Sequence, residues 1–228
     1  MPKEWGMISA FIYDPQDRTK DFFRLKDLFS EGVIVGGEVK VNTNFIDKPG
    51  EHHVGGIWKH TDLADLSVLA PPPSYPYPPA PPGGPSKPDS YTIYYGFDQY
   101  LGVFPGQRPG LAKRPRGWGV FGRASISDAN PTPYRFFLSA GIGGDTPFRC
   151  HAGDTFGIGW FYKGTSNEFG PFPRAVFGPR DGTGVEVYYN LQVTSWLNVT
   201  PDVQYLRPYL GALGIDSLIY GLRVNMRL

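Results

Sequence analysis

Charged side chains recur at alternate positions in several segments of this 228-residue chain. Arg123, Arg135, Glu186 and Arg223 each alternate with small or apolar residues in the sequence. In an extended strand, successive side chains point to opposite faces, so each of these residues would lie on a polar face opposite an apolar one. Such a face could hydrogen-bond a polar solute, or its charges could form only salt bridges that hold neighbouring strands in shape.

The same alternation adds further polar residues to this face. Asp98, Glu38, Lys40 and Gln204 follow the first four as candidates. The wider set with the same phase comprises Lys59, Asn190, Gln192, Asn198, Asp202 and Asn225.

The sequence gives little support for a catalytic site or a metal site. The histidines, His52, His53, His60 and His151, fall in or near expected connections, and none lies beside a serine on a clear polar stripe. No Cys or carboxylate completes a zinc-ligand spacing around the first three, and Gly141-Ile-Gly-Gly144 lacks the phosphate-loop pattern. The sequence therefore predicts no enzyme active site, no metal site and no cofactor.

The elements that must position the polar face are strands. Most alternating segments are about ten residues long, near the ~9–11 residues that a tilted transmembrane strand needs, whereas soluble strands average about 5–6. We expect about nine strands. The candidate segments are residues 5–13, 32–45, 53–62, 91–103, 118–127, 134–143, 155–163, 185–194, 197–205 and 218–228. In the first of these segments, Trp5, Met7, Phe11 and Tyr13 are in phase. Because helical spacing is almost absent, the sequence does not favour parallel βαβ folds. Strands can cross lipid only as a closed barrel.

The last segment shows the pattern most completely. Leu218, Tyr220, Leu222, Val224 and Met226 are apolar, and the residues between them are mainly small or polar. A strand with one apolar and one cationic face fits the closing strand of an outer-membrane barrel, and it also fits the last strand of a soluble sandwich.

The amino-acid composition bears on the choice between an outer-membrane barrel and a soluble sandwich. The chain has 15% aromatic residues, 30 Gly and 24 Pro, which fits strands, tight turns and membrane-interface belts. Aromatic residues near the expected strand ends could form such belts: Trp58, Tyr91, Trp118, Tyr134, Tyr162, Trp196 and Tyr205. A net charge of +1 gives no argument for nucleic acid. No run of 18 apolar residues predicts a transmembrane helix, the start of the chain lacks the pattern of a signal peptide, and Cys150 is the only cysteine.

Irregular segments separate the strands. Residues 1–228 are expected to form one domain, with a Pro-rich insert at about 70–90 that reads as a surface loop or linker. A short helix is conceivable at 22–29, Pro49-Gly50 is expected to make a turn, and residues 164–182 to form a long loop. Pro201 is expected to cause a bulge or local kink. Tight turns are predicted at Ser195-Trp196 and at 128–133.

Several ordered motifs resemble the carbohydrate-selective (OprB-type) porins. The resemblance covers mainly residues 91–228 and rests on Tyr94-Tyr95-Gly-Phe-Asp-Gln-Tyr-Leu101, Trp118-Gly-Val-Phe-Gly-Arg-Ala-Ser-Ile-Ser-Asp-Ala-Asn-Pro-Thr-Pro133, Gly184-Val-Glu-Val-Tyr-Tyr-Asn, Val193-Thr-Ser-Trp-Leu-Asn-Val-Thr-Pro-Asp-Val-Gln204 and Tyr220-Gly-Leu-Arg-Val-Asn-Met-Arg-Leu228.

The resemblance implies an all-β, antiparallel transmembrane barrel of sixteen strands for passive, sugar-selective diffusion. It implies outer-membrane lipids and sugars as partners, in the outer membrane of a Gram-negative-type bacterium. The chain looks like the C-terminal portion of such a barrel. Either another polypeptide supplies the remaining strands, or the reading frame is truncated, or the chain is a non-functional barrel fragment. A soluble β-sandwich or binding module is the other alternative.

Overall fold

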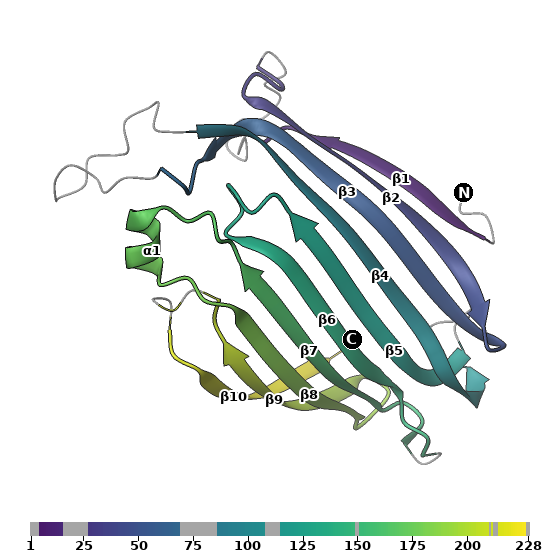
Figure 1. The fold of residues 1–228 in the computed structure, drawn as a ribbon. Helices are drawn as coiled ribbons and strands as arrows, with labels where there is room; N and C mark the ends of the chain where they lie inside the picture. Colours follow the sequence, from purple (N-terminus) through teal and green to yellow (C-terminus); the bar gives the residue numbers. More distant parts are fainter. Residues whose placement is uncertain are drawn as a thin grey trace.

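The chain folds into one antiparallel sheet in which every strand neighbours the strands before and after it in sequence (Figure 1). The computed structural model describes residues 5–15, 27–68, 86–107, 115–148, 151–209, 211 and 214–226. Its ten strands are β1 (Gly6–Tyr13), β2 (Gly32–Phe45), β3 (Lys48–Ala64), β4 (Ser86–Gln107), β5 (Pro115–Ser127), β6 (Tyr134–Asp145), β7 (Thr155–Thr165), β8 (Gly182–Gln192), β9 (Leu197–Arg207) and β10 (Ser217–Met226).

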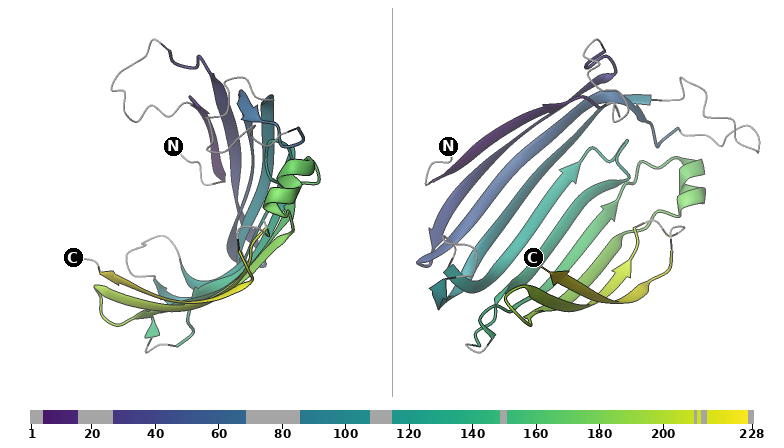
Figure 2. Two further views of the ribbon diagram at one scale, coloured as in Figure 1. Left: turned by 90° about the vertical axis from the view of Figure 1, so that its left-hand side faces the viewer. Right: turned by 180° about the vertical axis from the view of Figure 1, so that it is seen from behind.

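The sheet bends into a trough with β1 and β10 at its two edges (Figure 2). Within the described residues, no ladder joins β10 to β1, so the sheet is not closed. The prediction of an all-β antiparallel fold is confirmed, with ten strands rather than about nine. In the described part of the chain, no helix is both long enough and apolar enough to cross a bilayer.

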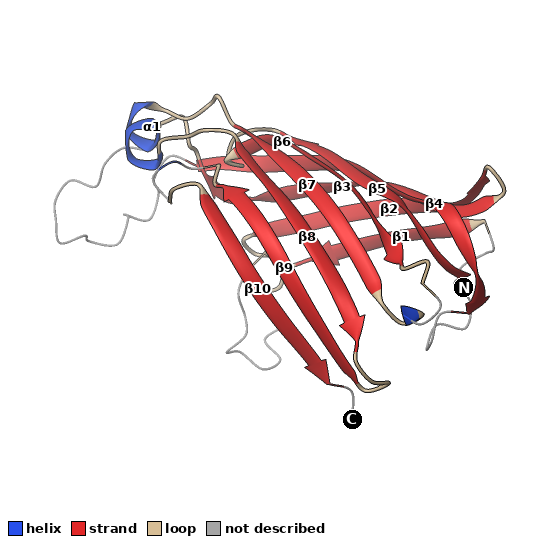
Figure 3. Cartoon of the chain, turned by 90° about the horizontal axis from the view of Figure 1, so that it is seen from below, coloured by secondary structure: helices blue, strands red, loops and turns tan. Residues whose placement is uncertain are grey.

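Register assigns each side chain to one of two faces, because directly opposed residues in an antiparallel pair share a face. Val35 of β2 lies opposite Trp58 of β3, which lies opposite Tyr91 of β4. We call this face the apolar face, and its large side chains are exposed along most of the sheet. The opposite, polar face holds the alternate residues. Figure 3 shows the strands of the same sheet from below.

Strand β1 follows its neighbour and departs from the expected phase. Ile8 and Ile12 lie opposite Val39 and Val35, so they belong to the apolar face. Met7, Phe11 and Tyr13, which are in phase in the sequence, lie on the polar face instead. The phase of β1 is therefore set by pairing with β2 rather than by its largest residues.

The turn between β2 and β3 lies three residues before its predicted place. Ile46 and Asp47 form a two-residue connection, and both have positive φ angles, 53° and 54°. Positive φ at both central residues is the geometry of a type I′ hairpin, whose usual signal is Asn-Gly or Asp-Gly. Ile46-Asp47 lacks that signal, so the sequence did not reveal this turn. The turn predicted at Pro49-Gly50 was wrong, because Pro49 and Gly50 belong to β3.

Proline positions explain two further differences. The register of the β3–β4 ladder shifts between His60 and Leu63, and Pro88 lies in β4 between the partners of those two residues. A bulge tolerates a residue that cannot donate to the ladder, so β4 begins at Ser86, within the expected insert. Residues 69–85 lie outside the described residues.

Pro201 lies in β9 without the predicted bulge. It pairs with Leu222 of β10, and the register against β8 is the same before and after it. Between Tyr188 and Leu191, however, the β8–β9 ladder is interrupted. The missing N–H therefore costs pairing on one side only, and no extra residue is inserted.

A short helix interrupts the long loop predicted at 164–182. Helix α1 (Pro171–Phe177) has a proline at its start, and Gly178 in the left-handed conformation ends it (φ 52°). Proline is favoured in the first helical turn because the N–H groups there have no intrahelical acceptor. Glycine is favoured at the end of a helix because it adopts the left-handed conformation without strain. Of the helix conceived at 22–29, residues 22–26 lie outside the described residues and 27–29 belong to a turn.

The loops beside α1 interlock at one end of the sheet. Asn130, which is almost fully buried, donates from Nδ2 to Asp65 Oδ1 (2.8 Å) and accepts at Oδ1 from the Leu66 N–H (2.9 Å). Lys87 Nζ donates to the Asn130 carbonyl oxygen (2.5 Å). The Gly170 N–H donates to the Leu66 carbonyl oxygen (2.9 Å), which ties the α1 loop to the same cluster. The connections after β3, β5 and β7 therefore form one unit.

An arginine on the apolar face tests which face meets lipid. Leu222 lies in the middle of β10 on that face and is exposed. We expect Leu222→Arg to destabilise the membrane-inserted protein by ~2–4 kcal/mol if this position is near the bilayer midplane. Asn225→Arg, on the polar face of the same strand, is the control and should leave stability nearly unchanged. Urea unfolding in liposomes measures both, and an equal effect of the two variants would contradict the assignment of faces.

Acid should loosen the interlocked loops through Asp65. Hydrogen bonds from Asn130 and then Ser67 lower the pKa of the Asp65 carboxyl below its ordinary value of 3.8. A group with a lowered pKa stabilises the fold above its ordinary pKa, and this contribution disappears as the pH falls through the folded-state value. We expect Asp65→Asn to lower the melting temperature at neutral pH, with a difference from wild type that shrinks well below pH 3.8. A difference independent of pH would contradict this role for the carboxylate.

Candidate functional site

The strand ladders place seven of the eight first-choice polar residues on the polar face of the sheet. Lys40 lies opposite His53, which lies opposite Gly96, and Gly96 lies opposite Arg123. Continuing through the other ladders, the same face holds Glu38, Asp98, Glu186, Gln204 and Arg223. Arg135 is the exception, because it lies at the register shift between Tyr134 and Phe136 and no ladder pairs it.

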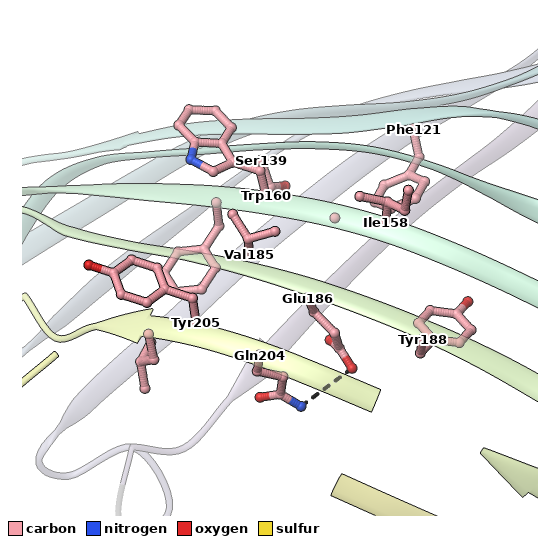
Figure 4. A pocket seen from close by; sticks show the side chains of 12 residues that line it. Phe121, Ser139, Ile158, Trp160, Val185, Glu186, Tyr188, Gln204 and Tyr205 are labelled. Carbon is pink, nitrogen blue, oxygen red and sulfur yellow. Dashed lines mark hydrogen bonds between the residues drawn. The ribbon is translucent and has the colours of Figure 1, made fainter. Parts of the chain in front are cut away.

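This polar face is the more crowded of the two. In β8, Val185, Val187 and Tyr189 are exposed, whereas Glu186 and Tyr188, which alternate with them, are less exposed and Gly184 is buried. Side chains converge on the inside of a curved sheet and diverge on its outside, so this difference assigns the polar face to the inside of the trough. Figure 4 shows Trp160 and Val185 on the opposite side of the strands from Glu186 and Gln204.

Three of the predicted residues meet in one cluster on β8, β9 and β10. Arg223 donates from Nη2 to Glu186 Oε1 (3.2 Å), and Gln204 donates from Nε2 to the same oxygen (3.4 Å). Asp202, from the wider set, accepts from Gln204 Nε2 (2.8 Å) and lies 3.5 Å from Arg223 Nε. The Asp202 carboxylate is buried over Gly221, where any side chain would overlap it.

Two more predicted residues bind partners that the sequence pattern had not singled out. Lys40 forms an ion pair with Glu51 of β3 (2.6 Å between Nζ and Oε1). The Tyr94 hydroxyl donates to Glu38 Oε2 (2.9 Å). Both new partners were detectable in principle, because Tyr94 has the same phase as Asp98 in β4 and Glu51 the same phase as Lys59 in β3.

The remaining predicted residues are not brought into a cluster. Arg123, Arg135 and Asp98 are exposed, and their side chains make no hydrogen bond or ion pair with another residue of the described ranges. The charged groups of Arg123 and Asp98 therefore face the inside of the trough without a partner among the described residues.

Aromatic rings on the polar face lie against glycines of neighbouring strands. Phe11 covers Gly36, Tyr94 covers Gly55, Phe121 covers Gly141, Phe161 covers Gly184 and Tyr188 covers Gly157, and a Cβ atom at each glycine would overlap the ring. The glycines make room for these rings against the wall of the trough. The inside of the trough therefore gains apolar surface without being filled.

The histidines do not form a common site. His52 and His60 lie on the apolar face and His53 on the polar face, as the alternation of β3 requires. His52 Nδ1 is bonded to the Tyr95 hydroxyl (2.6 Å), and His60 Nδ1 lies 3.0 Å from Asp89 Oδ1. Over the described ranges, no three His, Cys, Asp or Glu residues are grouped so that they could hold a metal ion.

The comparison with protein families agrees with this geometry. A model described as "Carbohydrate-selective porin, OprB family" matches residues 7–227. The chain belongs to the OprB family of carbohydrate-selective porins. This is a family of transport channels, and its porins are outer-membrane proteins of Gram-negative bacteria.

Two solved structures share the fold of this OprB-family chain. The high-pH structure of Pseudomonas putida OprB is 18% identical, with a TM-score of 0.73 over 98% of this chain and 56% of that one. The low-pH structure of the same protein is 16% identical, with a TM-score of 0.51 over 86% of this chain and 47% of that one. The chain thus spans about half the length of the porins it matches. No curated protein matches it.

The cluster of this OprB-family chain predicts an order of mutational effects. Arg223 and Glu186 are both well exposed, and exposed ion pairs are worth ~0.2–1 kcal/mol, so Arg223→Ala should cost little. Asp202→Ala removes a buried carboxylate together with its hydrogen bond from Gln204 Nε2, and a hydrogen bond to a charged group is worth about 1.5–3 kcal/mol, so this variant should cost more. Urea unfolding of the membrane-inserted variants checks this order, and a larger loss in Arg223→Ala would contradict it.

Proposed function

We propose that this chain forms part of the wall of an outer-membrane channel for passive, sugar-selective diffusion. The observation that carries the proposal is the two-faced sheet: seven charged and amide residues share the inside of the trough, and large apolar side chains cover the outside. Family membership supports the same function. Outer-membrane lipids would contact the apolar face, and sugars would pass along the polar face.

The chemistry of sugars suits this polar face. A sugar is neutral and carries many hydroxyl groups, each of which donates and accepts hydrogen bonds. Arg123 and Arg135 offer donors and Asp98 offers acceptors, and the cluster of Glu186 with Gln204 offers both. A narrow pore lined with such groups can replace part of the water around a sugar and still release it, so transport needs no catalytic group or cofactor.

The edges of the sheet define a structural partner. Lipid cannot satisfy unpaired backbone groups, and β1 and β10 each have one edge without a strand in the described residues. We propose that further strands pair with both edges and close the barrel. These strands would come from a further part of the same polypeptide or from another chain.

A soluble sandwich or binding module is less compatible with the structure. It would have to cover the apolar face with another layer, but exposed apolar residues extend from Ile8 in β1 to Leu222 in β10. An exposed apolar surface of this extent marks contact with a membrane or another protein.

Sugar flux through the intact assembly tests the proposed function. Protein purified from outer membranes, with whatever strands complete the barrel, is reconstituted in liposomes, and swelling is followed in D-glucose, maltose and a charged solute of similar size. The proposal predicts faster swelling in the two sugars. Equal rates for all three solutes, or no swelling in any, would overturn it.

Two arginine variants test the selective role of the polar face. We expect Arg123→Ala and Arg135→Ala each to reduce sugar flux by about two- to tenfold, the effect of losing one hydrogen bond of about 0.5–1.5 kcal/mol. Leu138→Ala, on the apolar face of β6, is the matched control and should leave flux unchanged. Unchanged flux in both arginine variants would show that these residues do not select sugars.

A further inference from the structure

A hollow lies on the polar face where five strands line up. Phe121 of β5, Gly141 of β6, Gly159 of β7, Glu186 of β8 and Gln204 of β9 lie directly opposite one another, in that order. The hollow at this row has a volume of about 260 Å³ (Figure 4). Along this row, an aromatic ring is followed by two glycines, a carboxylate and an amide.

Aromatic rings border the hollow. Phe121, Phe161 and Tyr188 line it, and each ring lies over a glycine of a neighbouring strand. These rings come from β5, β7 and β8, so the apolar border is built by three strands. Because each ring occupies the space that a Cβ atom of the glycine would fill, the rings lie against the wall of the trough.

Gly159 leaves the floor of the hollow open. A Cβ atom placed there would meet only Phe121 Cζ, at 3.8 Å, which is ordinary van der Waals contact. Gly141 beside it differs, because the Phe121 ring already occupies the space above it. The sequence therefore keeps Gly159 without a side chain although the space above it would hold one.

Three polar side chains, those of Glu186, Gln204 and Ser139, also line the hollow. The Glu186 carboxylate lies opposite Gly159, and its Oε1 is held by Gln204 Nε2 (3.4 Å) and Arg223 Nη2 (3.2 Å). Ser139 adds a hydroxyl from β6. The neighbouring groups orient the carboxylate while Oε2 makes no hydrogen bond within the described ranges, so Glu186 can accept a hydrogen bond from a solute.

We propose that this hollow is a binding subsite for a single pyranose ring within the permeation path, an inference that rests on the proposed function. A pyranose has C–H groups on its faces and hydroxyl groups around its rim. The rings of Phe121, Phe161 and Tyr188 would cover the faces, and Glu186, Gln204 and Ser139 would bond the rim. Ligand sites commonly combine apolar walls with a few convergent polar groups in this way.

The size of the hollow limits the ligand. Pockets for drug-sized ligands have volumes of about 300–1,000 Å³, so about 260 Å³ suits one sugar ring rather than an oligosaccharide. The hollow is also open to the inside of the trough. A sugar held there can leave again, as passive transport requires.

Filling the hollow tests the subsite. In planar bilayers, the intact assembly carries a KCl current, and block of that current by D-glucose and by maltose reports binding inside the pore. Gly159→Val places a side chain on the open floor, and valine is favoured in strands. We expect the sugar concentration that gives half block to rise about tenfold or more for both sugars, as for the loss of one or two hydrogen bonds. The KCl current should change far less.

Gly56→Val is the matched control. Gly56 lies on the apolar face of β3, and a Cβ atom there would meet only the Thr92 carbonyl oxygen, at 3.7 Å. This variant should keep both the KCl current and the sugar block of wild type. A Gly159→Val channel with wild-type sugar block, or one in which KCl current and sugar block fall in proportion, would overturn the subsite.

Two further comparisons keep the outcomes separate. If Gly159→Val does not assemble, Phe161→Ala and Glu186→Gln are measured in its place, and wild-type sugar block in both would overturn the subsite. The absence of both sugar flux and sugar block in the wild-type channel would instead overturn the proposed function. Sugar flux in wild type together with unchanged block in the variants rejects the subsite alone.

Discussion

The need to pair every backbone group in a medium without water is the constraint on which this structure depends. Inside a bilayer, an unpaired N–H or C=O group has no water to bond, so strands must bond to one another along their whole length. The described strands meet this requirement by the simplest topology, in which each strand pairs with its neighbours in sequence. Only β1 and β10 have an edge left over, and the proposed closing strands belong there. Once the ladder is fixed, register decides which side chains face lipid and which face the inside.

Side chains on the polar face then follow from the ladder. Glycines receive the aromatic rings of neighbouring strands, which keeps these rings on the wall and the inside open. Prolines, which cannot donate to a ladder, are tolerated where pairing is already imperfect, as at Pro88 beside a register shift and at Pro201 beside an interruption. Some charged residues are paired, as in the Glu186–Arg223 cluster and the Lys40–Glu51 ion pair, whereas the Arg123 side chain has no partner among the described residues.

Sequence alone could predict the alternation of faces, because a period of two belongs to the strand itself. The bounds of β2 and the common face of seven of the eight polar candidates were therefore accessible, whereas the register shift at Arg135 was not. Features that depend on a neighbouring strand were not. The phase of β1 is fixed by its register with β2, the Ile46-Asp47 turn lacks the usual residues, and the meeting of Glu186 with Arg223 joins β8 to β10 across β9. The hollow over Gly159 likewise depends on the alignment of five strands.

The central claim is that one face of this sheet meets lipid and the other meets water and sugar. Spin labels placed one at a time at residues 185–190 of β8 test it most directly, with Cys150 replaced by serine and the protein inserted in liposomes. Collisions with oxygen, which concentrates in lipid, and with a water-soluble nickel complex are measured at each position. The account predicts oxygen maxima at Val185, Val187 and Tyr189 and nickel maxima at Glu186, Tyr188 and Asn190, with sugar reducing only the nickel collisions. Equal accessibility at successive positions would contradict it.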